Sequence, residues 1–173
     1  MKEYAVIYAD PPWSYKNKKT GRNMMLGSIS KYPVMSLQEI CSLKVPSSKD
    51  SVLFLWATVP LLPDAFKVME SWGFKYKTMI TWRKIMSLGM GFWWRGQCEH
   101  LLFGVKGKIK AFRMQEANFI QTKVGKHSEK PNEIRQLIER ATVSLNPKLE
   151  LFARKKYNNW DSWGNEISND INL

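Results

Sequence analysis

Short apolar runs alternate with segments of helical periodicity along most of the chain. Runs rich in β-branched and aromatic residues predict buried strands at 4–9, 51–56, 76–82, 99–105 and 149–153. Apolar residues that recur at helical spacing predict amphipathic helices at 63–72 and 132–142. A shorter helix is expected to begin at Ser36, with Glu39 three residues later, and to end before Pro46.

This alternation predicts an α/β domain with a mostly parallel sheet flanked by helices, whose ligands bind at the carboxyl ends of the strands. A chain of 173 residues with 44% hydrophobic content fits one domain over residues 1–173. Two polar segments interrupt the pattern. Residues 14–33 are expected to form a long mobile loop, and 106–126 an irregular or hairpin-like segment that is a candidate nucleic-acid surface.

The charge of the chain is strongly positive. There are 27 Lys and Arg against 15 Asp and Glu, a formal net charge of +12. Such a surplus in a compact domain favours partners that carry phosphates, although a basic surface that serves solubility alone explains it about as well.

Cysteine usage and hydropathy bear on compartment and metals. Cys41 and Cys98 lack the paired spacing of disulfide frameworks or metal sites, so we expect a reduced intracellular protein without a metal. No apolar run approaches the ~20 residues that a membrane-spanning helix needs. A cytoplasmic protein without a membrane partner is therefore expected.

Asp10-Pro11-Pro12-Trp13 directly follows the first predicted strand and suits the methylation of an aromatic amine. The amine of adenine is a poor nucleophile, because its lone pair is delocalised into the ring. Attack on a sulfonium methyl is helped by acceptors that hold its N–H bonds. The carboxylate of Asp10 and the backbone carbonyl of Pro11 can be those acceptors, and Pro12 helps to fix the backbone. Trp13 offers a flat face on which an extruded base can stack.

The alternative is that the tetrapeptide is a turn with a buried aromatic, because proline pairs often mark loops. Its place at the end of the first strand, where an α/β sheet binds its ligands, favours the catalytic interpretation.

With its other motifs, the chain resembles the MT-A family, whose members include the catalytic subunits of mRNA N6-adenosine methyltransferases and bacterial and phage enzymes that modify DNA adenine. The resemblance covers nearly the whole chain. Besides Asp10 to Trp13, it rests on segments at 52–58, 80–84, 99–107, 127–133, 149–154 and 163–166.

The resemblance implies a Rossmann-like class I methyltransferase fold with a permuted motif order, in which the tetrapeptide comes early and part of the S-adenosylmethionine site follows the last strands. Asn165 and Glu166 match residues that bind the ribose hydroxyls, and Lys130 matches a lysine beside the active site that would pair with the cofactor carboxylate or with Glu99. The implied cofactor-binding set is Asp10, Lys130, Phe152, Arg154, Lys156, Tyr157, Asn165 and Glu166, in which Lys156 and Tyr157 depart from the family pattern.

Nucleic acid is the expected partner, and the short form of the chain resembles the bacterial or phage branch, so DNA is favoured over RNA. Tyr32 matches a tyrosine of the loop that covers the target base, and packing beneath that loop is an equal alternative. The expected substrate-binding set is Trp13, Tyr32, Lys18, Lys19, Arg22, Lys108, Lys110 and Arg113.

The apolar and aromatic segment 86–95 corresponds in eukaryotic relatives to a loop that joins two related subunits. We therefore expect a homodimer, or a heterodimer with a related subunit, through these residues. Three other functions stay open: RNA N6-adenosine methylation, methylation of another amine such as that of cytosine, and a catalytically silent subunit. Silent relatives lose the acid or the aromatic, whereas Asp10 and Trp13 are both present here. His100 is expected to be structural.

Overall fold

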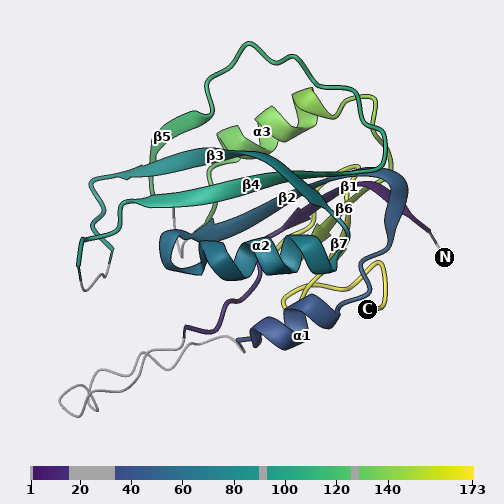
Figure 1. Cartoon of the computed structure of the whole chain (residues 1–173), viewed down its shortest axis with the longest axis horizontal. Helices are drawn as coiled ribbons and strands as arrows, with labels where there is room; N and C mark the ends of the chain where they lie inside the picture. The colour runs from purple at the N-terminus through teal and green to yellow at the C-terminus, as the bar shows by residue number, and fades with distance from the viewer. Residues whose placement is uncertain (1, 16–33, 90–92, 126–128) are drawn as a thin grey trace.

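The computed structural model describes residues 2–15, 34–89, 93–125 and 129–173, and seven strands in them form one sheet (Figure 1). The order across the sheet is β5-β3-β4-β2-β1-β6-β7. The strands are β1 (Tyr4–Ala9), β2 (Ser47–Thr58), β3 (Lys75–Ile85), β4 (Cys98–Lys106), β5 (Phe119–Lys123), β6 (Lys148–Leu151) and β7 (Asp161–Trp163).

The sheet is mixed but mostly parallel. β1 is parallel to β2 on one side and to β6 on the other, β7 is parallel to β6, and β5 is parallel to β3. β4 is antiparallel to both of its neighbours, β2 and β3. Every strand except β4 therefore runs in the same direction, which confirms the predicted fold class.

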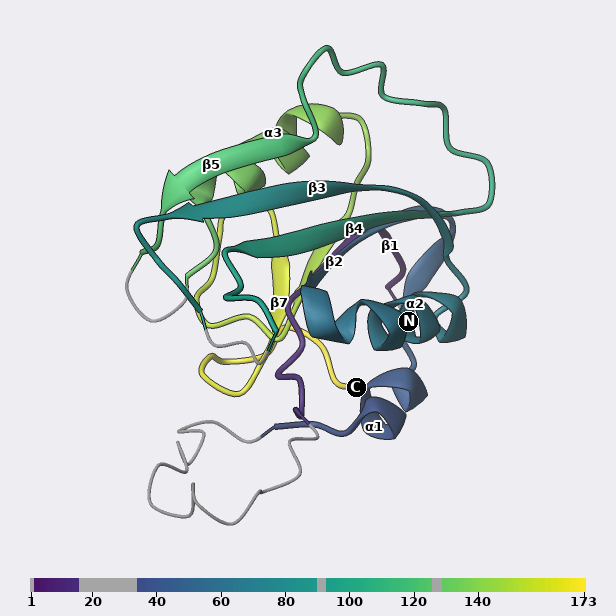
Figure 2. The same ribbon diagram turned by 60° about the vertical axis from the view of Figure 1, so that its left-hand side comes forward.

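Helices cover both faces of the sheet, as Figures 1 and 2 show. The helices α1 (Leu37–Ser42) and α2 (Leu62–Ser71), with a short 3₁₀ turn (Val59–Leu61) before α2, lie on one face, and α3 (Asn132–Ala141) lies on the other. Alternate residues of β1 serve the two layers, because successive side chains of a strand point to opposite faces. Ile7 packs in the cluster that includes Ile40 and Met69, while Val6 packs with Ile134.

The start of α1 follows the sequence prediction. The Ser36 side chain accepts a hydrogen bond from the Glu39 backbone N–H, and the Glu39 carboxylate accepts one from the Ser36 backbone N–H. This capping box satisfies two N–H groups that a helix start leaves without partners. Among the described residues, no helix combines the length and the apolar composition needed to cross a bilayer.

The structure differs from the sequence predictions mainly at the sheet edges. β5 forms within the segment 106–126, which was expected to be irregular or hairpin-like, and β7 was not predicted. β5 is a strand with exposed alternate residues and β7 has three residues, so neither has the apolar run of a buried strand. The last strong strand stops at Leu151 rather than at Ala153, because Phe152 adopts a φ of 61°.

Gly164 follows β7 where the chain passes close to Ala153, and a Cβ atom at this position would lie 2.1 Å from the Ala153 carbonyl oxygen. We expect Gly164→Ala to lower the thermal unfolding midpoint by several degrees, because overpacking of this kind costs roughly 1–3 kcal/mol. Thermal unfolding followed by circular dichroism measures the effect. Gly125→Ala is the matched control, since its Cβ would meet no atom closer than 3.5 Å. Equal midpoints for the two variants would contradict the close approach.

Candidate active site

The tetrapeptide Asp10 to Trp13 lines a cavity of about 410 Å³ at the carboxyl ends of β1, β2, β6 and β7. The sheet brings residues from both halves of the chain to this end of the strands, because β1 lies between β2 and β6. Nine residues of the predicted site line the cavity: Asp10, Pro11, Pro12, Trp13, Lys130, Phe152, Arg154, Asn165 and Glu166.

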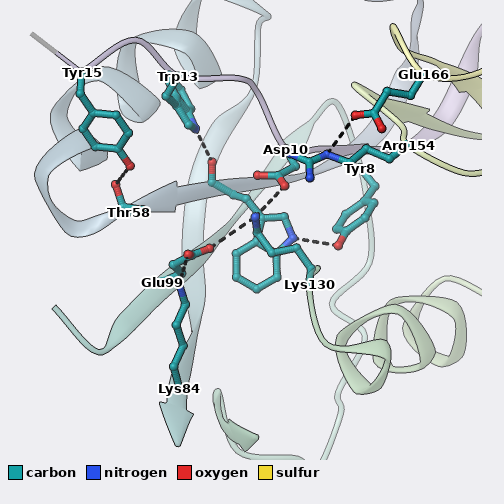
Figure 3. Close-up of polar contacts among 11 residues, drawn as sticks. Tyr8, Asp10, Trp13, Tyr15, Thr58, Lys84, Glu99, Lys130, Arg154 and Glu166 are labelled. Atoms are coloured by element: carbon teal, nitrogen blue, oxygen red, sulfur yellow. Dashed lines mark hydrogen bonds and ion pairs between the residues drawn. The ribbon is translucent and has the colours of Figure 1, made fainter. Parts of the chain in front are cut away.

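Lys130 joins two carboxylates of this cavity (Figure 3). Its Nζ lies 2.6 Å from Asp10 Oδ2 and 3.4 Å from Glu99 Oε2. Glu99 also pairs with Lys84 from β3, so four charges of alternating sign form a row. The sequence offered the cofactor carboxylate or Glu99 as the partner of Lys130, and the structure pairs it with Glu99 and Asp10.

Burial and charge act in opposite directions on this row. Burial lowers the pKa of the Lys130 ammonium, but the carboxylates of Asp10 and Glu99 outweigh burial and raise that pKa above its ordinary value. For Glu99, burial raises the pKa, and Lys130 and Lys84 together bring it below its ordinary value. At neutral pH Lys130 is therefore a cation and Glu99 an anion. Lys130 accordingly cannot take a proton from a substrate.

Trp13 is held in a fixed orientation at the cavity wall. Its indole Nε1 donates a 3.0 Å hydrogen bond to the backbone carbonyl of Trp56, and its backbone pairs with Met35. Trp13 is half-buried and packs against the core cluster beneath α1, yet it also lines the cavity. The two roles considered from the sequence, a base platform and a core aromatic, are therefore compatible.

A second layer of aromatic residues lies beneath the charges. Trp56 Nε1 donates a 2.8 Å hydrogen bond to the hydroxyl of Tyr8, and Lys130 Nζ lies 5.3 Å from the centre of a Trp56 ring. Such a cation–π contact favours the charged form of the amine in a buried place. The Trp56 ring thus helps to stabilise the Lys130 ammonium.

The backbone of the tetrapeptide is itself hydrogen-bonded. The Pro11 carbonyl accepts a 2.9 Å hydrogen bond from Trp13 N–H, and the Pro12 carbonyl accepts one of 2.9 Å from Met35 N–H. A carbonyl oxygen has two lone pairs, so the Pro11 carbonyl can accept a second hydrogen bond. Asp10 Oδ1 is likewise the carboxylate oxygen that does not face Lys130.

A second cavity of about 620 Å³ adjoins the first on the side of α3. Both cavities are lined by Asp10, Lys130, Phe152, Arg154 and Glu166. The two spaces therefore share a wall, and the Asp10 carboxylate is part of it.

The remaining predicted cofactor residues lie at the edge of this region. Arg154 pairs with Glu166 at 3.6 Å. Tyr157 lines the second cavity, where its ring packs 3.5 Å from the guanidinium carbon of Arg135. Lys156 lines neither cavity and pairs instead with Asp170 at 2.5 Å. Contact of Lys156 with a cofactor stays a prediction.

Lys108, Lys110 and Arg113, three of the basic residues expected to bind substrate, do not line the Asp10 cavity. These residues follow β4. Because β4 is antiparallel to its neighbours, its carboxyl end lies at the opposite end of the strands from the cavity. Lys108 N–H donates a 2.6 Å hydrogen bond to Asp50, near the start of β2. The other four expected residues, Lys18, Lys19, Arg22 and Tyr32, lie outside the described residues.

Sequence reasoning missed part of the cavity wall. Tyr15, Met35 and Thr58 line it, and the Tyr15 hydroxyl is 2.8 Å from Thr58 Oγ1. Thr58 ends β2 and Tyr15 follows the tetrapeptide by two residues, so their positions after the first two strands were the available signal. His100 Nδ1 lies 3.1 Å from Thr81 Oγ1, and burial lowers the pKa of its ring, which fits the structural role expected for it.

Among the residues that the structure describes, no three His, Cys, Asp or Glu side chains lie close enough together to hold a metal ion. A cavity with acidic and aromatic residues at the carboxyl ends of parallel strands places the protein in the class of α/β proteins that bind ligands at this end of the sheet.

Comparison with known proteins identifies the class further. The profile of the MT-A70 family matches residues 4–166. The type II methyltransferase M.MunI of Mycoplasma sp is 38% identical over 185 residues, which cover 96% of this chain and 78% of the relative. The chain therefore belongs to the MT-A70 family of methyltransferases.

Eukaryotic relatives match over the same region. The N(6)-adenosine-methyltransferase MT-A70-like protein of Arabidopsis thaliana is 32% identical over 175 residues, and the N(6)-adenosine-methyltransferase subunit METTL3 of Danio rerio is 31% identical over 176. Each alignment covers 95% of this chain, but only 24% and 28% of these relatives. The chain thus spans about a quarter of their length.

We expect Lys130→Met to lower the free energy of unfolding at neutral pH by roughly 3 kcal/mol, because it leaves two carboxylates in the cavity wall without the cation between them. Denaturant unfolding of the two proteins measures the difference. The exposed pair Lys67–Asp64 provides the control, since Lys67→Met should cost less than about 1 kcal/mol.

The same difference should depend on pH. The lowered pKa of Glu99 stabilises the folded state above the unfolded carboxyl pKa, and this contribution is lost as pH falls through the folded pKa. The raised pKa of Lys130 means that its charge stabilises the folded state fully below the pKa of the unfolded amine. This stabilisation is lost as the pH rises through the pKa of Lys130 in the folded state. The gap between wild type and variant should therefore shrink below about pH 4. A gap that is constant down to pH 3 would contradict this electrostatic origin.

Proposed function

We propose that this chain transfers the methyl group of S-adenosylmethionine to the N6 amine of adenine in nucleic acid, with DNA preferred. The observation that carries the proposal is the position of Asp10, whose carboxylate lines two adjoining cavities and lies beside Trp13. The methyl donor and the target base would meet in the first cavity, where Trp13 and Asn165 both line the wall beside Asp10.

The residues present suit the donor. Phe152 offers an apolar face, Asn165 and Glu166 offer amide and carboxylate acceptors for ribose hydroxyls, and all three line the first cavity. Bound there, S-adenosylmethionine supplies an electrophilic methyl group on its sulfonium.

The roles of Asp10 and Lys130 follow from their geometry. Lys130 holds Asp10 Oδ2 at 2.6 Å, which fixes the carboxylate while Oδ1 accepts an N–H bond of the adenine amine. The free lone pair of the Pro11 carbonyl accepts the second N–H. Both acceptors stabilise the positive charge that grows on nitrogen as the C–N bond forms, and the extra proton leaves afterwards to solvent.

Trp13 would stack on the adenine. Its hydrogen bond to Trp56 holds the ring at the cavity wall before a base arrives, so little ordering remains to be done on binding. An adenine in a duplex would have to leave the stack to reach this place.

The preference for DNA rests on which relatives the chain matches over most of their length. The type II methyltransferase of Mycoplasma is matched over 78% of its length, whereas the named N(6)-adenosine-methyltransferases of plants and animals are matched over about a quarter. Those names make RNA the second candidate substrate. The presence of Asp10 and Trp13 together in the cavity argues against a silent subunit.

Asp10→Asn keeps the shape of the side chain but removes its charge, so methyl transfer should fall by about 10²–10³-fold while the protein stays folded. Mass spectrometry of nucleosides measures this after incubation of unmethylated plasmid DNA, or of an RNA transcript, with S-adenosylmethionine. N6-methyladenine in DNA is the product expected. Methylcytosine alone would redirect the substrate assignment, and full activity of the variant would remove the mechanism.

Trp13→Ala should raise KM for nucleic acid by about tenfold or more, because stacking on an aromatic side chain contributes ~1–3 kcal/mol per base. Steady-state methylation kinetics test this. Trp13→Phe is the control: it keeps the aromatic face and loses the hydrogen bond to Trp56, so its KM should stay within a few-fold of wild type. An unchanged KM in Trp13→Ala would assign the residue to the core alone.

A further inference from the structure

Apolar side chains are unusually exposed on the hairpin that joins β3 to β4. Trp93 and Trp94 have relative exposures of 93% and 90%, and Met86 on the first arm has 87%. Leu88 is also exposed. Exposed apolar patches of this kind generally mark a binding surface.

Two hydrogen bonds join the arms of the hairpin, and both connect Gly89 on the first arm to residues 95–96 on the second. Gly89 N–H donates a 2.7 Å hydrogen bond to the Gly96 carbonyl, and Arg95 Nε donates one of 2.6 Å to the Gly89 carbonyl. Trp93 and Trp94 therefore project from a structured base.

This base adjoins the catalytic cavity. Lys84 N–H donates a 2.8 Å hydrogen bond to the Gln97 carbonyl, and Lys84 pairs through its side chain with Glu99. Glu99 lines the cavity with Asp10. The hairpin accordingly leaves the sheet at the same end as the tetrapeptide, as Figure 1 shows.

The charge of the segment restricts its partner. Lys84 is paired with Glu99, which leaves Arg83 and Arg95 as the cations of residues 83–98, and these residues include no Asp or Glu. A two-fold interface would place this segment close to its own copy and bring like charges together. Nucleic acid instead supplies phosphates for the cations and flat base faces for the indoles.

We propose that Trp93 and Trp94 bind bases of the nucleic acid next to the adenine that enters the cavity. The inference rests on the proposed function and adds a contact to the nucleic acid substrate outside the cavity. When a base leaves a duplex, its neighbours lose a stacking partner, and an inserted aromatic side chain replaces it. Two adjacent indoles beside the cavity suit that role.

The test uses a fluorescently labelled 20-base-pair duplex with one abasic site, the same duplex intact, and one strand of the intact duplex alone. Fluorescence anisotropy at several salt concentrations gives the Kd of the wild type, of the double variant Trp93→Ala, Trp94→Ala, and of Tyr76→Ala. Tyr76 is the control because it is an aromatic side chain, 41% exposed, at the opposite end of β3.

We expect the wild type to prefer the abasic duplex, and the double variant to lose that preference together with about tenfold or more in affinity. Its slope of log Kd against log salt should be unchanged, because the phosphate contacts of Lys and Arg remain. Tyr76→Ala should bind like the wild type.

Equal affinity of the double variant and the wild type would overturn the inference and leave the proposed function intact. So would a wild-type dimer that the double variant converts to a monomer with unchanged duplex affinity, since the segment would then join subunits, as its sequence suggested. A wild type that binds neither duplex nor a single strand would overturn the proposed function itself.

Discussion

The site depends on one buried ammonium. Lys130 comes from the segment before α3, and its side chain is 15% exposed. It joins Asp10, at the end of β1, to Glu99, at the start of β4. Because both carboxylates pair with the same ammonium, the two strand ends and the segment before α3 are held together. Lys84 extends the same pairing to β3.

The other wall of the site is set by the backbone after β6. Phe152 adopts a φ of 61°, a conformation that a bulky residue seldom takes, and such conformations persist where surrounding contacts enforce them. The turn sends Arg154 toward Glu166, which follows β7. Gly164 permits this approach, since a side chain there would meet Ala153. The two ends of the cavity thus depend on different means, ion pairs on one side and close backbone packing on the other.

How far the sequence predicted this arrangement depends on whether the determinant was local. β1 and the capping box of α1 could be predicted because run length and a four-residue pattern specify them. β5 and β7 could not, because pairing with the neighbouring strands β3 and β6 specifies them, and neither has the apolar run of a buried strand. The direction of β4 is a property of topology, and it carries Lys108 away from the site that its charge suggested. The role of Asp10 could be predicted from its residue type and its place after a strand. The positions of Tyr15 and Thr58 in the cavity wall could not, because they depend on which strand ends lie side by side.

Trp13 shows why core and catalytic roles are difficult to separate here. Its ring packs on the core and lines the cavity, while its N–H is held by Trp56, which in turn lies under Lys130 and bonds to Tyr8. A rigid platform is what a site needs when it must present a base within a few tenths of an ångström of a reacting methyl. The same packing that stabilises the sheet therefore supplies the precision of the site, and a change beneath Trp13 acts on stability and on methyl transfer together.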